Sequence, residues 1–213
     1  MRGQIDVCND NHWKEVEQIT GWFSRDEAIA MQRIVKQLAP GARLVELGSF
    51  QGRSSVVIAS VLSKDSRLYC VDHFEGSAEH QGQADLDNLL EIFINNIKKF
   101  HVDNKIRALA MTTLEAATKF TEKSLDLVFI DASHDYESVK ADILQWYPKI
   151  KPGRFLICHD YQTPGWPGVA QAIEILQLSG EMIGGSLWLH QKAKRRRAQS
   201  PWTFLKRLMR LIK

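Results

Sequence analysis

Residues 44–55, LVELGSFQGRSS, decide the fold of this chain. The apolar residues before Gly48 predict a short buried strand, and the apolar run 56–59 after Gly52 predicts a helix. A strand, a glycine turn and a helix form the first unit of a doubly wound α/β domain, in which ligands bind outside the carboxyl ends of the strands. Gly48 and Gly52 let the backbone bend there and approach a ligand closely.

Glu46, near the end of this predicted strand, indicates which ligand suits the turn. A dinucleotide fold has the pattern G-x-G-x-x-G and places a pyrophosphate on the helix N-terminus. Here the pattern is E-x-G-x-x-x-G, and a carboxylate at the turn would repel a pyrophosphate but suit a cationic ligand with an ammonium group. The alternative is a strand-turn-helix unit with a surface glutamate that binds nothing.

Length and composition predict one globular α/β domain. The 213 residues suffice for one domain with a proper core, and the apolar content of 44% and charged content of 25% are ordinary. There is no apolar run of about 18 residues, and the first ten residues are polar, so we expect neither a spanning helix nor a standard secretion signal. Cys8, Cys70 and Cys158 lack metal-type spacing, which favours a reduced, cytoplasmic location.

The basic residues gather at the C-terminal end. Nine of the 28 Lys and Arg lie in 190–213, a segment with no acid, so the remainder carries 19 bases against 25 acids, about −6. We therefore expect no nucleic-acid partner for the body. Residues 200–213 predict a helix with one apolar and one basic half, typical of a peripheral contact with anionic lipid at the inner membrane surface. The alternative is docking on the protein's own body or on a second subunit; the oligomeric state stays open.

Periodicity predicts the remaining elements. The segment 13–39 is mostly helical, with Ser24 and Glu27 forming a capping box at the start of its second part. The polar loop 73–85 suits a substrate lid. A helix is expected at 86–100, and others begin near 136 and 167. Strands are expected at 43–47, 67–71, 106–110, 125–130 and 154–158, with a closing hairpin at 181–183 and 186–190 through Gly184-Gly185.

Four of these strands carry an acid at or near the carboxyl end: Glu46, Asp72, Asp131 and Asp160. In right-handed βαβ units the carboxyl ends of the strands lie at one edge of the sheet. Asp131 and the pair His159-Asp160 should therefore be neighbours. Two carboxylates and an imidazole suit a divalent cation such as Mg²⁺ or Mn²⁺.

The segments FIDASHDYESVKADI (129–143) and KPGRFLICHDY (151–161), together with the E-x-G-x-x-x-G turn, resemble the class I S-adenosylmethionine-dependent methyltransferases. The resemblance covers about 15–191. It is closest to the branch of metal-dependent O-methyltransferases and the methyltransferase and hydroxylase relatives of cephalosporin biosynthesis. Two glycines common in the family are Phe50 and Arg154 here. The family has a Rossmann-like, doubly wound, seven-stranded mixed sheet with helices on both faces.

The resemblance implies roles for particular residues. Asp72, at the end of the second strand, would bind the ribose of S-adenosylmethionine. Asp131 and His134 would be catalytic, with His134 as a base where catechol-type relatives carry lysine; an N-terminal helix cap or a surface histidine is the alternative. The cofactor-binding set is Glu46, Gly48, Ser49, Gly52, Asp72 and Thr112, and the metal ligands are Asp131, His159 and Asp160. Relatives often have an acid at the middle metal position, so His159 leaves the metal's identity open.

The expected function is transfer of a methyl group from S-adenosylmethionine to a hydroxyl of a small molecule or sugar, with a divalent metal orienting and acidifying the acceptor. The expected division is a helical lead-in over the cleft (1–40), a methyltransferase domain (41–191) and a basic amphipathic tail (192–213). Three alternatives remain open. Hydroxylase-like chemistry would show oxygen and 2-oxoglutarate dependence, a metal-dependent hydrolase would be insensitive to the cofactor, and a non-catalytic protein would bind it without turnover.

Overall fold

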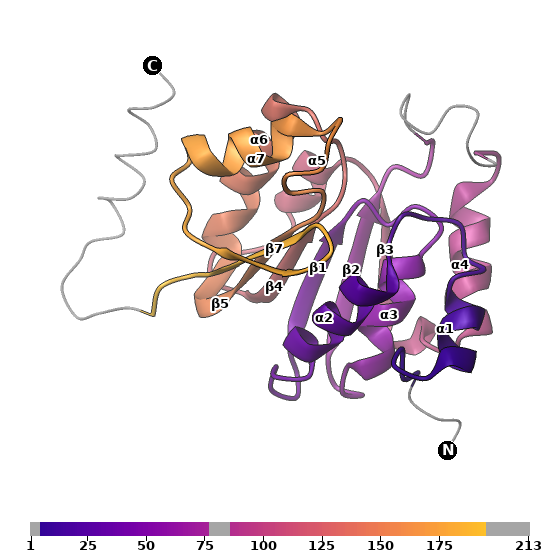
Figure 1. Ribbon diagram of the computed structural model, residues 1–213. Coiled ribbons are helices and arrows are strands. Elements are labelled where there is room, and N and C mark those ends of the chain that lie inside the picture. Colours follow the sequence, from indigo (N-terminus) through magenta and orange to yellow (C-terminus); the bar gives the residue numbers. More distant parts are fainter. Residues whose placement is uncertain (1–4, 77–85, 195–213) are drawn as a thin grey trace.

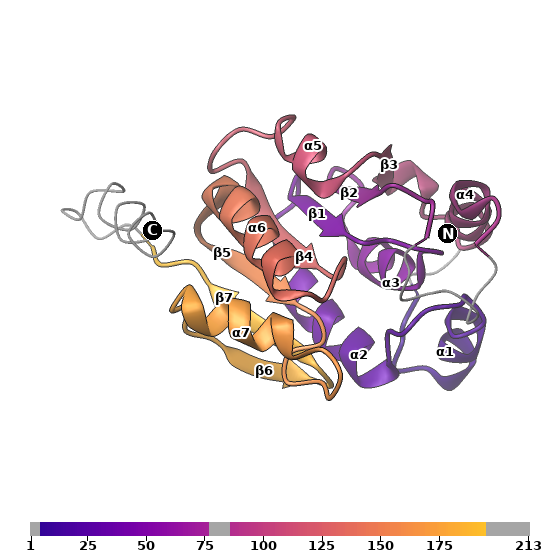
Figure 2. The ribbon, with the colours of Figure 1, turned by 90° about the horizontal axis from the view of Figure 1, so that it is seen from above.

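The computed structural model describes residues 5–76 and 86–194. A seven-stranded sheet in the order β3-β2-β1-β4-β5-β7-β6 runs through the molecule, with helices on both of its faces (Figures 1 and 2). The first five strands of this order pair in parallel, whereas β7 is antiparallel to both β5 and β6. The predicted fold class, a Rossmann-like mixed sheet of seven strands, is therefore confirmed.

The elements follow one another along the chain as alternating helices and strands. The strands are β1 (Arg43–Leu47), β2 (Arg67–Asp72), β3 (Ile106–Ala110), β4 (Leu125–Ile130), β5 (Ile150–Cys158), β6 (Glu181–Gly184) and β7 (Leu187–Gln191). The helices are α1 (Asp10–Val16), α2 (Arg25–Val35), α3 (Arg53–Val61), α4 (Leu89–Lys99), α5 (Thr113–Ala117), α6 (Tyr136–Trp146) and α7 (Pro167–Ile175), with short 3₁₀ turns η2 (Asp103–Lys105) and η3 (Tyr147–Lys149).

Side-chain alternation along β1 explains the two-sided core. Leu44 points into the apolar cluster under α1 to α4, and Val45 and Leu47 point into the cluster on the other face, with α5 to α7. Each large apolar side chain that is fully buried, such as Trp146, stabilises the fold by about 1.5–3 kcal/mol. Glu46 has the parity of Leu44, so its carboxylate enters the α3 side of the sheet.

The structure refines three predicted elements. The lead-in forms two helices, α1 and α2; Ser24 caps α2, and the predicted capping box with Glu27 is present. Strand β5 begins at Ile150, four residues before the predicted start, because Ile150 already pairs with Leu125; the predicted break at Pro152-Gly153 is an irregularity within the strand, where Gly153 has φ +79°. Helix α5 was not predicted, since its five residues are too few to show a period.

Two predicted features fall largely outside the described part of the chain. The lid at 73–85 is described only as far as residue 76, and the tail at 192–213 only as far as residue 194. Both the lid and the lipid-binding helix at 200–213 stay predictions. Among the described residues, no helix has the length and apolar character that crossing a membrane would require.

Candidate functional site

A cavity of about 940 Å³ opens along the carboxyl ends of the parallel strands. Its lining comes from the α1–α2 turn, the glycine loop after β1, and the loops after β2, β3, β4 and β5. It thus lies where doubly wound sheets bind ligands. Its lining includes glycines, acids, histidines and aromatic residues, among them Trp22, Glu27, Gly48, Ser49, Phe50, Gly52, Asp72, Thr112, Asp131, His134, His159, Asp160, Trp166 and Ser186.

The glycine loop 48–52 needs its glycines for different reasons. At Gly48 (φ +81°) an added Cβ would lie 1.9 Å from the backbone oxygen of Asp131, so no side chain fits where β1 and β4 end side by side. At Gly52 (φ +92°) an added Cβ would lie 3.0 Å from the Phe93 ring. Both residues also adopt left-handed backbone conformations, which favour glycine.

Phe50 occupies a position that the resembling family fills with glycine, and the backbone explains that preference. Its φ is +45°, a left-handed conformation that bulky residues rarely adopt. The Phe50 ring packs against Trp22, with ring centroids 5.4 Å apart. Phe50 therefore places an aromatic ring between the glycine loop and the lead-in, where the family has a glycine with no side chain.

Glu46 lies beneath the glycine loop and is not among the cavity-lining residues. It is fully buried, and its Oε2 accepts hydrogen bonds from the Ser49 hydroxyl (3.0 Å) and the Ser55 hydroxyl. Burial raises the pKa of this carboxyl, against the lowering effect of the serine hydrogen bonds. Ser49 stands between Glu46 and the cavity wall, so direct contact of Glu46 with a cofactor stays a prediction.

Asp72 holds the glycine loop in shape. Its Oδ2 accepts hydrogen bonds from the backbone amides of Ser49 (2.9 Å) and Phe50 (2.8 Å), and its Oδ1 accepts one from the Phe74 amide (2.7 Å). Asp72 also lines the cavity, as expected for the predicted ribose ligand. The sequence did not predict its second role of ordering the loop.

We expect both Asp72→Asn and Glu46→Gln to weaken S-adenosylmethionine binding by about 1–3 kcal/mol, because each change leaves a hydrogen-bond partner unsatisfied. Calorimetric titration of the folded variants measures this. The exposed acid Asp65, in the turn before β2, provides the control variant Asp65→Asn, which should bind normally. Unchanged affinity in both test variants would remove these residues from the cofactor site.

Thr112 lines the far end of the cavity and caps helix α5. Its side chain accepts a hydrogen bond from the Glu115 amide. The Glu115 carboxylate in turn accepts hydrogen bonds from the Thr112 amide and hydroxyl, which completes a capping box. The cap fixes the loop after β3 at the cavity wall. Contact of Thr112 with the cofactor stays a prediction.

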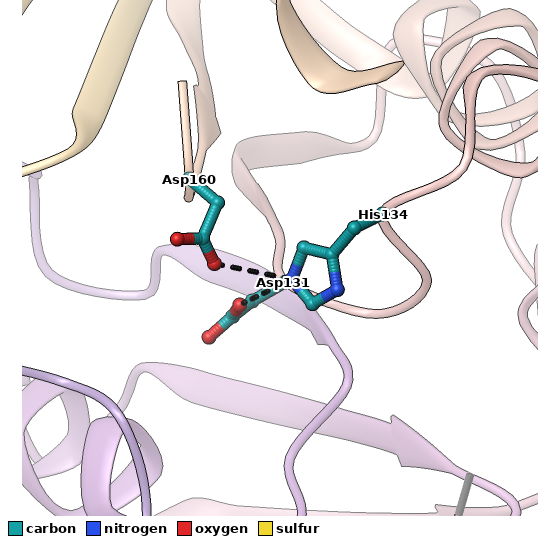
Figure 3. Close-up of side chains that lie close together, drawn as sticks. All are labelled: Asp131, His134 and Asp160. Atoms are coloured by element: carbon teal, nitrogen blue, oxygen red, sulfur yellow. Dashed lines mark ion pairs between the residues drawn. The ribbon is translucent and has the colours of Figure 1, made fainter. Parts of the chain in front are cut away.

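Asp131, His134 and Asp160 converge at the ends of β4 and β5 (Figure 3). His134 Nε2 lies 3.1 Å from Asp160 Oδ2 and 4.0 Å from Asp131 Oδ1. Ligand atoms of the three residues all lie within 4.8 Å of one another. Two carboxylates and one imidazole are a donor set that fits a divalent cation of the Mg²⁺ or Mn²⁺ type.

His159 approaches the same two acids from a buried position, 4% exposed. Its Nδ1 lies 2.7 Å from Asp160 Oδ2 and 3.1 Å from Asp131 Oδ1. Burial lowers the pKa of His159, but the charge of Asp131 and the surrounding hydrogen bonds outweigh it and raise that pKa well above its usual range. The predicted neighbourhood of Asp131, His159 and Asp160 is present. The sequence predicted His159 as metal ligand and His134 as base; both roles stay predictions, since both rings border the acids.

The Asp160 carboxyl has a low pKa. Burial would raise it, but hydrogen bonds with His134 and His159 hold it below its usual range. Asp160 itself adopts a left-handed backbone conformation, with φ +54°. The carboxylate is therefore charged across the neutral range.

Sequence reasoning missed two residues at this site. Glu27 was interpreted only as a capping-box residue, yet its Oε1 lies 3.3 Å from His159 Nε2. Burial would raise the pKa of Glu27, but its hydrogen bond and charge interaction with His159 lower it to about 2. Trp166 stacks on the His134 ring, with centroids 4.6 Å apart. No pattern signals either contact, because both join segments far apart in the chain.

This mixed sheet, with its glycine loop and the cavity at the carboxyl ends of the parallel strands, has the architecture of a Rossmann-like methyltransferase. The family model described as "Methyltransferase domain" matches residues 45–161, more than half of the chain, and the chain belongs to this family. The predicted membership of the class I S-adenosylmethionine-dependent methyltransferases is thereby confirmed; the particular branch stays a prediction.

One curated protein is similar to this chain in sequence. The chain is 29% identical over 133 residues to the uncharacterized protein y4gI of Sinorhizobium fredii, covering 61% of the chain and 14% of that protein. The chain therefore spans about one seventh of the length of this curated relative.

Solved O-methyltransferases share the architecture. NovP is 18% identical, with a TM-score of 0.61 over 82% of this chain and 84% of NovP. A Bacillus cereus O-methyltransferase, solved in complex with SAH, is 18% identical, with a TM-score of 0.59 over 87% and 89% of the two chains. TomG of Streptomyces achromogenes, involved in tomaymycin synthesis and solved with SAM, is 15% identical, with a TM-score of 0.59 over 89% and 88%. At these identities the likeness establishes the fold alone.

Proposed function

We propose that this protein transfers a methyl group from S-adenosylmethionine to a hydroxyl of a small molecule or sugar, with a divalent cation at the acid cluster. The observation that carries the proposal is that one cavity joins the glycine loop to Asp131, His134 and Asp160. Membership of the methyltransferase family supports the cofactor. The O-methyltransferases among the structural neighbours support a hydroxyl acceptor.

The glycine loop and Asp72 would hold the cofactor, with Ser49 and Thr112 at the cavity wall. S-adenosylmethionine supplies an electrophilic methyl group, and a bound cation acidifies a hydroxyl beside it. Asp131 and Asp160 would hold that cation with one histidine. His134 lies within 3.1 Å of Asp160 at the cavity wall, where its imidazole could take the hydroxyl proton near neutral pH.

Aromatic side chains border the acceptor side of the cavity. Trp166 stacks on His134, and Trp22 is 51% exposed although it contacts Phe50. Flat apolar walls of this kind suit an aromatic ring or the apolar face of a sugar, and they help to keep water away from the reacting hydroxyl. We propose peripheral membrane contact only for residues 200–213, on the charge and apolar pattern of their sequence.

Titration calorimetry with S-adenosylmethionine, with and without Mg²⁺, tests the proposal. We expect micromolar or tighter binding of the cofactor in either condition, and methyl transfer to a hydroxyl acceptor only when Mg²⁺ is present. The hydrolase alternative would gain support if the cofactor failed to bind. Binding without transfer to any of a panel of phenols and glycosides would favour a non-catalytic role.

A further inference from the structure

The two carboxylate oxygens of Glu27 make different contacts. Oε2 accepts hydrogen bonds from the Ser24 amide (2.8 Å) and the Ser24 hydroxyl (2.7 Å), which completes the capping box of α2. Oε1 takes no part in that cap. It points at the acid cluster instead, where it meets His159 and Ser186.

The first contact of Oε1 controls the His159 ring. His159 Nε2 lies 3.3 Å from Glu27 Oε1, and Nδ1 on the opposite side of the ring lies between Asp160 and Asp131. An imidazole is planar and rigid, so a partner at one nitrogen sets the direction of the other. Glu27 therefore fixes how His159 meets the two carboxylates.

The second contact controls the backbone of Asp160. The Ser186 hydroxyl donates to Glu27 Oε1 (2.8 Å) and accepts from the Asp160 amide (3.1 Å), while the Ser186 amide also donates to Glu27 (2.9 Å). Asp160 has a left-handed conformation that a non-glycine residue keeps only where its surroundings impose it. One oxygen of Glu27 thus supports both the backbone and the side chain of Asp160.

The turn between β6 and β7 is shaped around this carboxylate. An added Cβ at Gly185 (φ +51°) would lie 2.5 Å from Glu27 Oε1, and one at Gly184 would lie 2.8 Å from the Ala30 Cβ. The two glycines of the predicted hairpin therefore allow α2 to approach closely. Side chains there would push Glu27 away from the acids.

We infer that Glu27 is a positioning residue: through His159 and Ser186 it holds Asp131 and Asp160 in the arrangement that the proposed cation and acceptor need. The lead-in helix α2 is then part of the reaction site and not only a cover of the cleft. The inference rests on the proposed function for its catalytic meaning, while the geometry can be tested in the metal-free protein.

The test compares Glu27→Gln with the control Ser24→Ala in the full chain. Glutamine keeps the size of Glu27, but one of its two ends can no longer accept hydrogen bonds. Ser24→Ala weakens only the cap at Oε2. Three quantities are measured: the affinity for Mn²⁺, the affinity for S-adenosylhomocysteine, and the ¹⁵N–¹H spectrum of the His159 ring, assigned by its loss in His159→Gln.

For Glu27→Gln we expect the Mn²⁺ affinity to fall by about 10–100-fold, as for other groups that orient metal ligands. The His159 ring signals should shift, and the affinity for S-adenosylhomocysteine should stay within about twofold. Ser24→Ala should lower the melting temperature and leave all three quantities unchanged. If Glu27→Gln fails to fold, Ser186→Ala replaces it, with the same direction of change in Mn²⁺ affinity and in the His159 signals.

Wild-type Mn²⁺ affinity and an unshifted His159 spectrum in Glu27→Gln would overturn the inference and leave Glu27 as a helix cap. The proposed function has its own test, which does not depend on the role of Glu27. If the wild-type protein binds neither Mn²⁺ nor S-adenosylhomocysteine, the proposed function fails. The His159 spectrum of the metal-free variants still decides whether Glu27 positions the ring.

Discussion

Replacing Asp131 or Asp160 by asparagine is expected to abolish divalent-ion binding and to lower kcat for methyl transfer by about 10³-fold, since a bound cation supplies several kcal/mol of transition-state stabilisation. Both acids belong to the group whose ligand atoms lie within 4.8 Å of one another. Asparagine keeps the shape and removes the charge. The measurements are Mn²⁺ titration and single-turnover methyl transfer.

S-adenosylmethionine binding is the internal control for these variants, because the residues proposed to hold the cofactor, the glycine loop and Asp72, are left unchanged. His134→Gln then distinguishes the two roles open to that histidine. As a base, His134 contributes about 10²–10⁴-fold to kcat with the Mn²⁺ affinity intact; as a ligand, its loss weakens Mn²⁺ binding too. Full activity of the wild-type protein in excess EDTA would refute metal assistance and leave His134 as the only base.

Gly48→Ala is expected to destabilise the fold by about 2–5 kcal/mol, because the added methyl group meets backbone atoms and φ is strained. The new Cβ would lie 1.9 Å from the Asp131 oxygen, and a backbone group cannot swing aside as a flexible side chain can. Relief of the clash must move β1 and β4 apart at their ends. Chemical denaturation measures the loss, and cofactor titration of the folded fraction should show weakened binding.

Gly41→Ala provides a matched control for this prediction. Gly41 has nearly the same φ, +79° against +81°, but nothing lies within 4 Å of an added Cβ. Its substitution therefore measures the backbone strain alone, about 1–3 kcal/mol at most. If the two variants lose the same stability, the contact between Gly48 and Asp131 is not the reason for the glycine.

Several residues show how far sequence reasoning reached at the site. The acids after β2, β4 and β5 were placed at one sheet edge because carboxyl ends of parallel strands meet there, and the structure brings Asp131, His159 and Asp160 into contact. Asp72 was expected at the same sheet edge as a ribose ligand; it lies at that edge, where its bonds to the glycine-loop amides were not predicted, and the ribose role stays a prediction. Glu46 was expected to place its carboxylate beside the glycine turn, with a surface glutamate as the alternative; the structure buries it fully, hydrogen-bonded to Ser55 of α3.

Other features of the site could not be predicted from the sequence. The capping box with Ser24 already explains a glutamate at position 27. Nothing in the sequence pattern therefore indicates that its second oxygen accepts a hydrogen bond from Ser186, 159 residues away. The separate roles predicted for the two histidines, His159 as metal ligand and His134 as base, depend on side-chain directions that a sequence does not contain, and the structure places both rings beside the same two acids at the cavity. The lead-in was expected to be mostly helical with a second part starting at the Ser24 capping box, but the sequence did not indicate that the turn between α1 and α2 brings Trp22 and Glu27 to the cavity.

By itself the sequence determined the class of fold, the glycine turn after the first strand and the set of acids at the strand ends, because period, glycine spacing and strand order are local or topological properties. The tertiary structure alone decided which distant residues touch at the site: Glu27 with His159, Ser186 with Asp160, and Trp166 with His134. Those contacts join distant segments, and their geometry is set by close packing, in which a shift of one ångström separates a hydrogen bond from none.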